Sequence, residues 1–132
     1  MKNTETEKQV IGRYGEKQAA RYYRRHGAHI CARNFRAGRH EIDLIAETSD
    51  TLIFIEVKTR TQTPESNPFF GIPASAVTQE KIHSLKQAAY AYLGAHRTNR
   101  KIRFDVAEVY LGRGLFSRMK VLEVHIIEDA FR

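Results

Sequence analysis

Charged residues inside two strand-like apolar runs constrain this chain more than any other feature. The runs Glu41–Ala46 and Thr51–Lys58 are rich in β-branched and aliphatic residues, and a polar segment at 48–50 separates them. This pattern predicts two strands joined by a tight turn. Three charged residues interrupt the runs: Asp43, Glu56 and Lys58. Because burying an unpaired carboxylate costs several kcal/mol or more, the two acids need a compensating cation.

The alternation of side chains along a strand predicts which of these residues share a face. On the first strand Glu41, Asp43 and Ile45 are expected on one face. Ile42, Leu44 and Ala46 are expected on the other. On the second strand Phe54, Glu56 and Lys58 are expected on one face, and Ile53, Ile55 and Val57 on the other. Pairing of the strands as a hairpin then places Asp43 beside Glu56, with Lys58 two residues further along.

Two interpretations of the paired acids stay open at this point. A hard divalent metal such as Mg²⁺ or Mn²⁺, bound by the carboxylates with a lysine at its edge, would supply the missing positive charge. Alternatively, the residues form a structural Asp–Lys or Glu–Lys pair on a half-exposed sheet, since ion-pair networks often imitate functional sites.

Several short motifs along the chain, from about Ile11 to Tyr110, resemble the YraN-like family of uncharacterised proteins. The motifs are Gly15-Glu16, Asn34-Phe35-Arg36, the segment 41–45, the segment 56–60, Ala76-Val77-Thr78 with Lys81, and the segment 103–106. The acids and lysine also resemble the D…E-x-K core of restriction-endonuclease-like nucleases. The family is regarded as endonuclease-like and related to Holliday-junction resolvases. One departure is His40, where the family usually has glycine.

The resemblance implies a role for each residue of the site. It implies a catalytic group of four residues: Glu16, Asp43, Glu56 and Lys58. Asp43 and Glu56 would bind Mg²⁺ or Mn²⁺ together with the Val57 carbonyl, and Glu16 would join from a helix. We expect basic residues to grip the DNA backbone without reading its sequence: Arg13, Arg36, Arg39, Arg60 and Lys81.

Glu16 belongs to a predicted helix over residues 5–26, which ends at Gly27. Its neighbours at helical spacing are small, namely Gly12, Ala19 and Ala20. Small neighbours allow the helix to approach another element closely, so Glu16 is expected to reach the carboxylates of the sheet. The alternative is an exposed pairing of Glu16 with Lys17 or Arg13.

The order of the predicted elements favours an α/β fold. Helices are predicted over 5–26 and 78–93, and strands over 28–35, 41–46, 51–58, 102–111 and 121–127. This order predicts a restriction-endonuclease-like three-layer α/β/α sandwich with a mixed central sheet of about five strands. We expect one domain over residues 1–132, with a flexible N-terminus and a flexible loop at 61–74. In that loop Phe69-Phe70 is a candidate lid or dimer contact.

Charge and composition narrow the possible partners. The formal net charge is +7, which favours polyanions and nucleic acid in particular. A single cysteine excludes an internal disulfide and a cysteine-based zinc cluster, and the six histidines show no metal-ligand spacing. The chain has neither an apolar run that could cross a bilayer nor a signal-peptide core, so we expect a cytoplasmic protein with no membrane partner.

The sequence therefore leads to a hypothesis of metal-dependent DNA hydrolysis and to alternatives. The hypothesis is an endonuclease, structure-selective for branched DNA, acting in repair or recombination, with single-stranded DNA as a further substrate. Cutting of junctions would favour a homodimer. One alternative is a non-catalytic nucleic-acid-binding or scaffold protein on a nuclease-like fold, and another is a protein that acts on RNA.

Overall fold

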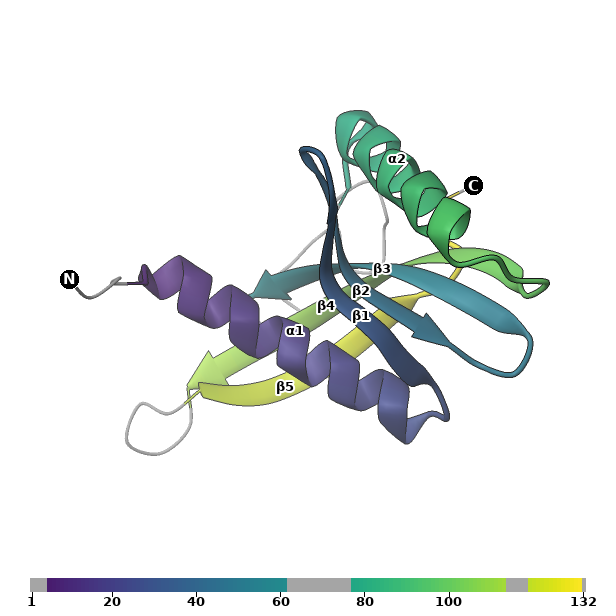
Figure 1. Cartoon of the computed structure of the whole chain (residues 1–132). Helices are drawn as coiled ribbons and strands as arrows, with labels where there is room; N and C mark the ends of the chain where they lie inside the picture. Colours follow the sequence, from purple (N-terminus) through teal and green to yellow (C-terminus); the bar gives the residue numbers. More distant parts are fainter. Residues whose placement is uncertain (1–4, 62–76, 114–118, 132) are drawn as a thin grey trace.

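A computed structural model of the chain describes residues 5–61, 77–113 and 119–131 (Figure 1). The described elements, in chain order, are α1 (Glu7–Arg25), β1 (His29–Ala37), β2 (His40–Glu47), β3 (Thr51–Arg60), α2 (Gln79–Ala95), β4 (Lys101–Arg113) and β5 (Met119–Ile127). The expected flexible N-terminus, and the loop with Phe69-Phe70, lie outside the described residues except for Thr61. No described helix is long and apolar enough to cross a membrane.

The five strands form one mixed sheet in the order β1-β2-β3-β4-β5. The pairs β1·β2, β2·β3 and β4·β5 are antiparallel, and β3·β4 is parallel. A parallel pair needs a crossover, and α2 lies in the connection between β3 and β4.

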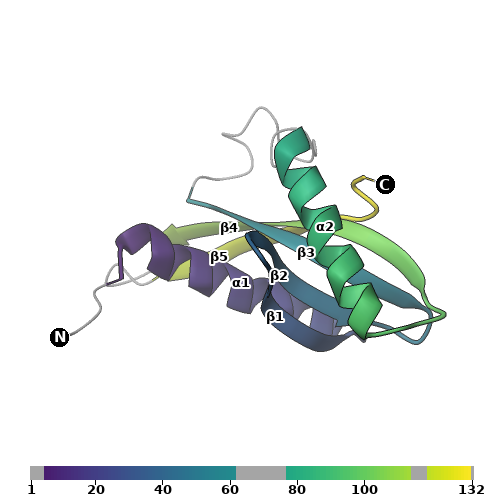
Figure 2. The same cartoon turned by 45° about the horizontal axis from the view of Figure 1, so that its top comes forward.

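The helices cover opposite faces of the sheet (Figure 2). Ala19, Ala20 and Tyr23 of α1 pack on one face in a cluster with residues such as Leu44, Ile55 and Val109. Leu85, Ala88, Ala89 and Tyr92 of α2 pack on the other face with residues such as Leu52, Phe54 and Val106. The predicted α/β/α sandwich with a mixed sheet of five strands is therefore confirmed, and it is the architecture that the family resemblance implied.

Local signals in the sequence set the ends of both helices. Thr6 caps α1 in a reciprocal box with Gln9, and Gly27, just beyond the helix, has a φ of +88° that suits glycine. Thr78 caps α2 by accepting the Lys81 backbone N–H at 3.2 Å.

The hairpin loops differ in how well the sequence predicted them. The loop between β2 and β3 falls at residues 48–50 as expected. The loop between β1 and β2 is shorter than the gap at 36–40 between the predicted strands, because only Gly38 and Arg39 lie outside the strands. Gly38 has a φ of +61°, which allows the two-residue turn, and Arg36 pairs with Glu41 inside the ladder.

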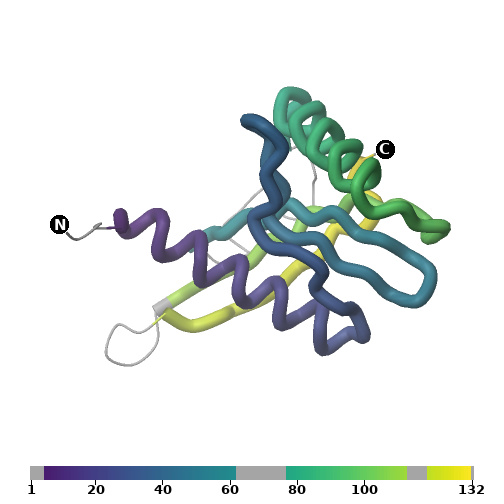
Figure 3. The backbone as a smooth tube through the Cα atoms, viewed as in Figure 1, coloured from purple at the N-terminus to yellow at the C-terminus, as the bar shows by residue number. Residues whose placement is uncertain are grey.

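The predicted alternation of faces along β2 is wrong at Ile42. Leu44 and Ala46 face α1 as expected, but Ile42 joins the cluster under α2. The cause lies on the paired strand, where Asn34 adopts a φ of +50° between the register pairs Arg33↔Leu44 and Phe35↔Ile42. Asparagine tolerates this left-handed backbone conformation better than most residues. The conformation reorients the end of the hairpin toward α2 (Figure 3).

Candidate active site

The candidate site lies where β2 and β3 separate. Their ladder ends at Leu44↔Ile55, whereas β3 continues beside β4 as far as Arg60. At this point the Asp43 carboxylate accepts the Val57 backbone N–H at 2.8 Å. A side chain thus replaces the missing ladder partner and fixes Asp43 at the edge of β3.

Glu56 lies one residue before Val57 and faces α2. It is 4% exposed, and Lys81 Nζ in the first turn of α2 is 3.6 Å from its Oε1. Its other oxygen, Oε2, is buried and has no hydrogen-bond partner. A cation in the first turn is unfavourable for the helix dipole, and the pairing of Lys81 with Glu56 explains why one is there.

Burial and mutual repulsion make the two carboxylates hard to ionise together. Desolvation raises the pKa of Glu56 to about 8, and the charge of Asp43 adds to this shift, while Lys81 and Lys58 oppose it. Desolvation also raises the pKa of Asp43, and its hydrogen bond from Val57 opposes that rise. Such a pair favours any added positive charge.

Glu16 reaches the site because α1 approaches β3 very closely at the preceding residue. Gly15 is buried, and a Cβ at that position would overlap the Thr59 side chain, starting with Oγ1. The contact that the sequence predicted from small residues is therefore real. It depends on Gly15, however, since a Cβ on Gly12 would meet nothing within 4 Å.

Asn34 links Glu16 to the hairpin. With its amide nitrogen facing the two acids, it donates to Glu41 Oε1 at 3.1 Å and to Glu16 Oε1 at 3.2 Å. Desolvation raises the pKa of Glu16, with a contribution from the Asp43 charge, and the Asn34 hydrogen bond opposes this rise. Four acids from three elements therefore gather here: Glu16, Glu41, Asp43 and Glu56.

These acids fit a divalent cation in the kind of donor that they offer. Buried carboxylate oxygens are the ligands of Mg²⁺ and Mn²⁺, and Glu56 Oε2 lacks a partner. In the arrangement seen within residues 5–61, 77–113 and 119–131, no three His, Cys, Asp or Glu side chains form a group that could hold a metal. Two carboxylates with a Mg²⁺ ion that keeps several waters need no third protein ligand.

Lys58 lies on the same face as Glu56, two residues further along β3, and is half-buried. Its neighbour in the parallel ladder is Glu108 of β4. Glu108 is 0% exposed, accepts the Tyr110 hydroxyl at 3.3 Å through Oε2, and has no partner at Oε1. A buried acid with a free oxygen thus lies beside the candidate catalytic lysine.

The five predicted DNA-binding cations do not form one patch. Arg13 of α1 pairs with Glu5, which precedes the helix, Arg36 lies 3.3 Å from Glu41 and Lys81 lies 3.6 Å from Glu56. Arg39 lines a hollow between the hairpin tip and α2, and Arg60 ends β3. They are distributed around the acids, on more than one side of the site.

His40 ties the hairpin tip to α2. Its Nδ1 lies 2.9 Å from Ser84 Oγ, and its ring stands edge-on to His83 at a centroid distance of 6.4 Å. The residue that departs from the family pattern therefore contacts a helix and lines the same hollow as Arg39.

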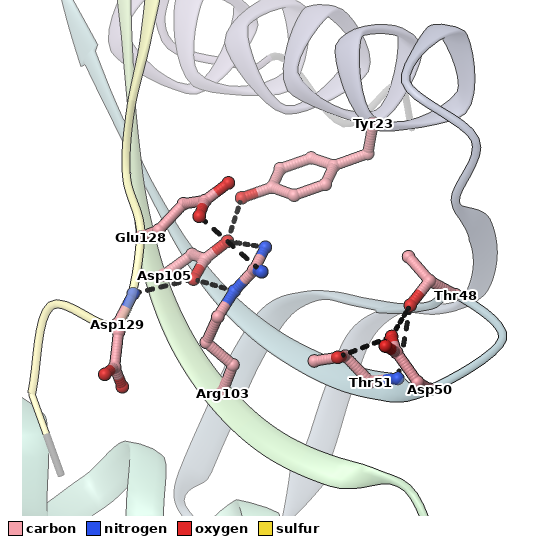
Figure 4. Close-up of polar contacts among 8 residues, drawn as sticks. All are labelled: Tyr23, Thr48, Asp50, Thr51, Arg103, Asp105, Glu128 and Asp129. Atoms are coloured by element: carbon pink, nitrogen blue, oxygen red, sulfur yellow. Dashed lines mark hydrogen bonds and ion pairs between the residues drawn. The ribbon is translucent and has the colours of Figure 1, made fainter.

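Asp105 has a structural role (Figure 4). It is 0% exposed and receives the Tyr23 hydroxyl at 2.8 Å, two bonds from Arg103 at 2.8 and 2.9 Å, and the Asp129 backbone N–H at 3.1 Å. The acid therefore joins α1 to β4 and to the residues after β5, with both oxygens satisfied.

Sequence reasoning missed Asn34, Glu41 and Glu108 as parts of the site. Asn34 lies in a quoted motif, and an asparagine between strand residues is a signal for positive φ. Glu108 is an acid within the apolar run Val106–Leu111, which is the signal that identified Glu56.

Comparisons with known proteins agree with the motif pattern. A protein from Caldicellulosiruptor saccharolyticus is 35% identical over 94% of this chain and 98% of its own length. A protein from Syntrophomonas wolfei is 42% identical over 79% of this chain and 87% of its own length. Both are named as UPF0102 proteins.

One solved structure is also similar, at a lower level. SfsA of Pyrococcus furiosus, solved in complex with Ca²⁺, aligns with a TM-score of 0.42 at 17% identity and covers 85% of this chain and 63% of its own. The model of uncharacterised protein family UPF0102 matches residues 15–109, which include every acid of the candidate site. The chain belongs to the UPF0102 family.

Proposed function

We propose that this protein is a metal-dependent DNA endonuclease whose centre is the Asp43–Glu56 pair. The observation that carries the proposal is the buried, unpartnered Oε2 of Glu56 beside a second carboxylate. A pair of buried acids without enough local positive charge is costly for a purely structural site. It is the usual arrangement for a divalent cation that assists phosphoryl transfer.

Each residue of the site has a distinct task in this proposal. Asp43, Glu56 and the Val57 carbonyl hold Mg²⁺ or Mn²⁺, and the Val57 N–H fixes the Asp43 carboxylate in place. When bound, the ion supplies Lewis acidity that activates water and offsets phosphate charge. The Lys58 ammonium stabilises the negative charge that develops on the phosphate. Glu16, held by Asn34, orients water on the α1 side.

DNA is the proposed substrate because the protein is positively charged. Selection by DNA structure is proposed because its cations form no base-reading patch. The net charge of +7 favours a polyanion, and cations surround the acids: Arg13, Arg36, Arg39, Arg60 and Lys81. These five cations are spread over α1, the β1–β2 hairpin, the end of β3 and α2 and form no single base-reading patch, so we propose selection of branched or single-stranded structure. The implied setting is DNA repair or recombination in the cytoplasm, with a homodimer as the form that cuts junctions.

The experiment is cleavage of labelled four-way junction, flap, duplex and single-stranded DNA, with RNA in parallel. Each substrate is incubated with Mg²⁺, Mn²⁺ or EDTA, and Asp43→Asn serves as the control for contaminating nucleases. Cleavage that needs the metal and disappears in the variant supports the proposal. Metal-dependent cleavage that persists in Asp43→Asn contradicts the assigned site.

A second candidate is a nucleic-acid-binding scaffold without catalysis. It is favoured by the internal pairing of the acids, since Asp43 bonds to Val57, Glu56 to Lys81, and Glu16 to Asn34. A scaffold would bind DNA in a salt-sensitive manner that ignores both Mg²⁺ and Asp43→Asn. The endonuclease would bind DNA more tightly when the metal neutralises the acids.

A further inference from the structure

A groove lies on the α1 side of the acids. It has a volume of about 440 Å³, and its walls include Arg13, Tyr14, Glu16, Lys17, Arg33 and Met119. The groove joins α1, β1 and β5, three elements that are far apart in the sequence. Its volume lies within the range of ligand pockets, and it suits a single nucleotide better than a duplex.

Positive charge dominates this groove. Arg13 and Lys17 lie one helical turn apart on α1, and Arg33 projects from β1, with all three side chains exposed. Arg13 pairs with Glu5, but both partners are exposed, so a phosphate can compete for the guanidinium. Three cations against two carboxylates, those of Glu16 and the exposed Glu5, leave a net positive charge that can bind a phosphate group.

The remaining walls are apolar and include an aromatic ring. Tyr14 is half-buried against the core under α1, and Val10 and Met119 lie beside it in the groove. A ring anchored in this way provides a surface on which a base or sugar can stack. Cations together with an aromatic surface are typical of sites for unpaired nucleotides, because a base in a duplex must first be unpaired and unstacked before it can reach the ring.

The groove is continuous with the acids. Glu16 and Asn34 line it, and the same two residues contact each other at the edge of the acid cluster. The Asp43 charge acts on Glu16 from the other side. A strand that lies in the groove therefore passes Glu16 and Asn34, the two residues through which the groove meets the acid cluster.

We propose that this groove binds an unpaired nucleotide of the strand that the site acts on, with its phosphate on Lys17, Arg33 and Arg13 and its base against Tyr14. The inference rests on the proposed function for its biological meaning and names the substrate as DNA with an unpaired segment. The binding itself requires no metal.

The test measures binding of a fluorescent 12-nucleotide single strand and a 12-base-pair duplex by anisotropy in EDTA across a salt series. The double variant Lys17→Ala/Arg33→Ala is compared with Arg21→Ala/Arg24→Ala. The control removes the same charge from exposed positions of α1 that do not line the groove. We expect the first pair to lower the salt slope for the single strand by about 1.4, since each lost phosphate contact contributes about 0.7. Equal slopes in the two double variants overturn the proposal.

Tyr14 separates stacking from charge. Tyr14→Leu is expected to weaken binding of the single strand about fivefold or more while changing duplex binding less than about twofold. Tyr14→Phe, which keeps the ring, should bind like the parent. Melting curves identify the variants that are folded. If Tyr14→Leu is unfolded, the binding of Tyr14→Phe is compared with that of the parent instead. An equal loss on both DNA forms, or a Tyr14→Phe loss as large as that of Tyr14→Leu, overturns the assignment of an unpaired base.

The outcome distinguishes this inference from the proposed function. Loss of single-strand binding in the groove variants, with no metal-dependent cleavage by the parent, supports the groove and contradicts the endonuclease. Metal-dependent cleavage by the parent, with unchanged binding by the groove variants, supports the endonuclease and contradicts the groove.

Discussion

Gly15 of α1 lies against Thr59 of β3 with no room for a methyl group between them. This contact sets the height of α1 above the sheet, and the next residue is the acid that α1 brings to the site. Packing and chemistry are therefore coupled at one position, because any side chain at residue 15 moves Glu16 away from Asp43.

We predict that Gly15→Ala destabilises the fold by about 1–3 kcal/mol, as overpacking does, and impairs the site beyond that loss. Gly12→Ala is the matched control, since a Cβ there has open space and alanine favours the helix by up to about 1 kcal/mol. Urea unfolding of both variants measures the difference. Equal stability of the two variants would contradict the close contact.

Glu56 should make the fold less stable as the pH rises. Its pKa is about 8 in the folded protein and 4.5 without the fold, so between these values the unfolded chain has lost a proton that the folded chain keeps. The free energy of unfolding then falls with increasing pH through this window, by at most about 1.4 kcal/mol per unit, and the effect levels off above pH 8.

The variant Glu56→Gln tests this dependence. It should match the parent near pH 4.5 and exceed it in stability near pH 8, because the amide carries no charge to bury. Thermal melting of both proteins from pH 4.5 to pH 8.5 in EDTA gives the comparison. Parallel pH profiles would show that Glu56 titrates normally. With Mn²⁺ present, the parent should regain stability at the higher pH.

Asn34 is expected to have two separable roles. Its backbone has a φ of +50°, and its amide bridges Glu16 and Glu41. Asn34→Gly keeps the backbone relaxed and loses only the bridge, whereas Asn34→Ala also adds about 1–2 kcal/mol of left-handed strain. Both variants should lose activity, and Asn34→Ala should also unfold at lower urea concentration. Equal midpoints would argue against backbone strain at this position.

Asp105 is predicted to serve stability alone. Tyr23→Phe removes one donor and leaves the bonds from Arg103 and Asp129, so the cost should be about 1–3 kcal/mol for a hydrogen bond to a charged group. Mn²⁺ affinity and cleavage by the folded variant should equal those of the parent. A changed Mn²⁺ affinity would place Asp105 in the functional site.

Local patterns were sufficient to predict the sheet and the pairing at its centre. The turn at 48–50 fixes the β2–β3 register as far as Leu44↔Ile55, and Asp43, the neighbour of Leu44 in β2, lies close enough to Glu56 for its charge to act on it. Alternation also predicted correctly that Ile53, Ile55 and Val57 of β3 share one face, which is the face toward α1.

The parts that were not predicted depend on contacts between distant residues. Ile42 turns toward α2 because Asn34 on the neighbouring strand breaks the alternation, and period-2 reasoning within β2 contains no such information. Gly15, and not Gly12, contacts β3 because of where α1 crosses Thr59. Lys81 pairs with Glu56 only because the crossover brings α2 above β3.

The central claim is that Asp43 and Glu56 together bind a divalent cation. Titration calorimetry of Mn²⁺ into the parent and into Asp43→Asn at pH 8 tests it most directly, with Glu123→Gln on the exposed part of β5 as a control that removes one acid elsewhere. We expect binding by the parent and by Glu123→Gln, and at least tenfold weaker binding by Asp43→Asn. Equal Mn²⁺ affinity in all three proteins would contradict it.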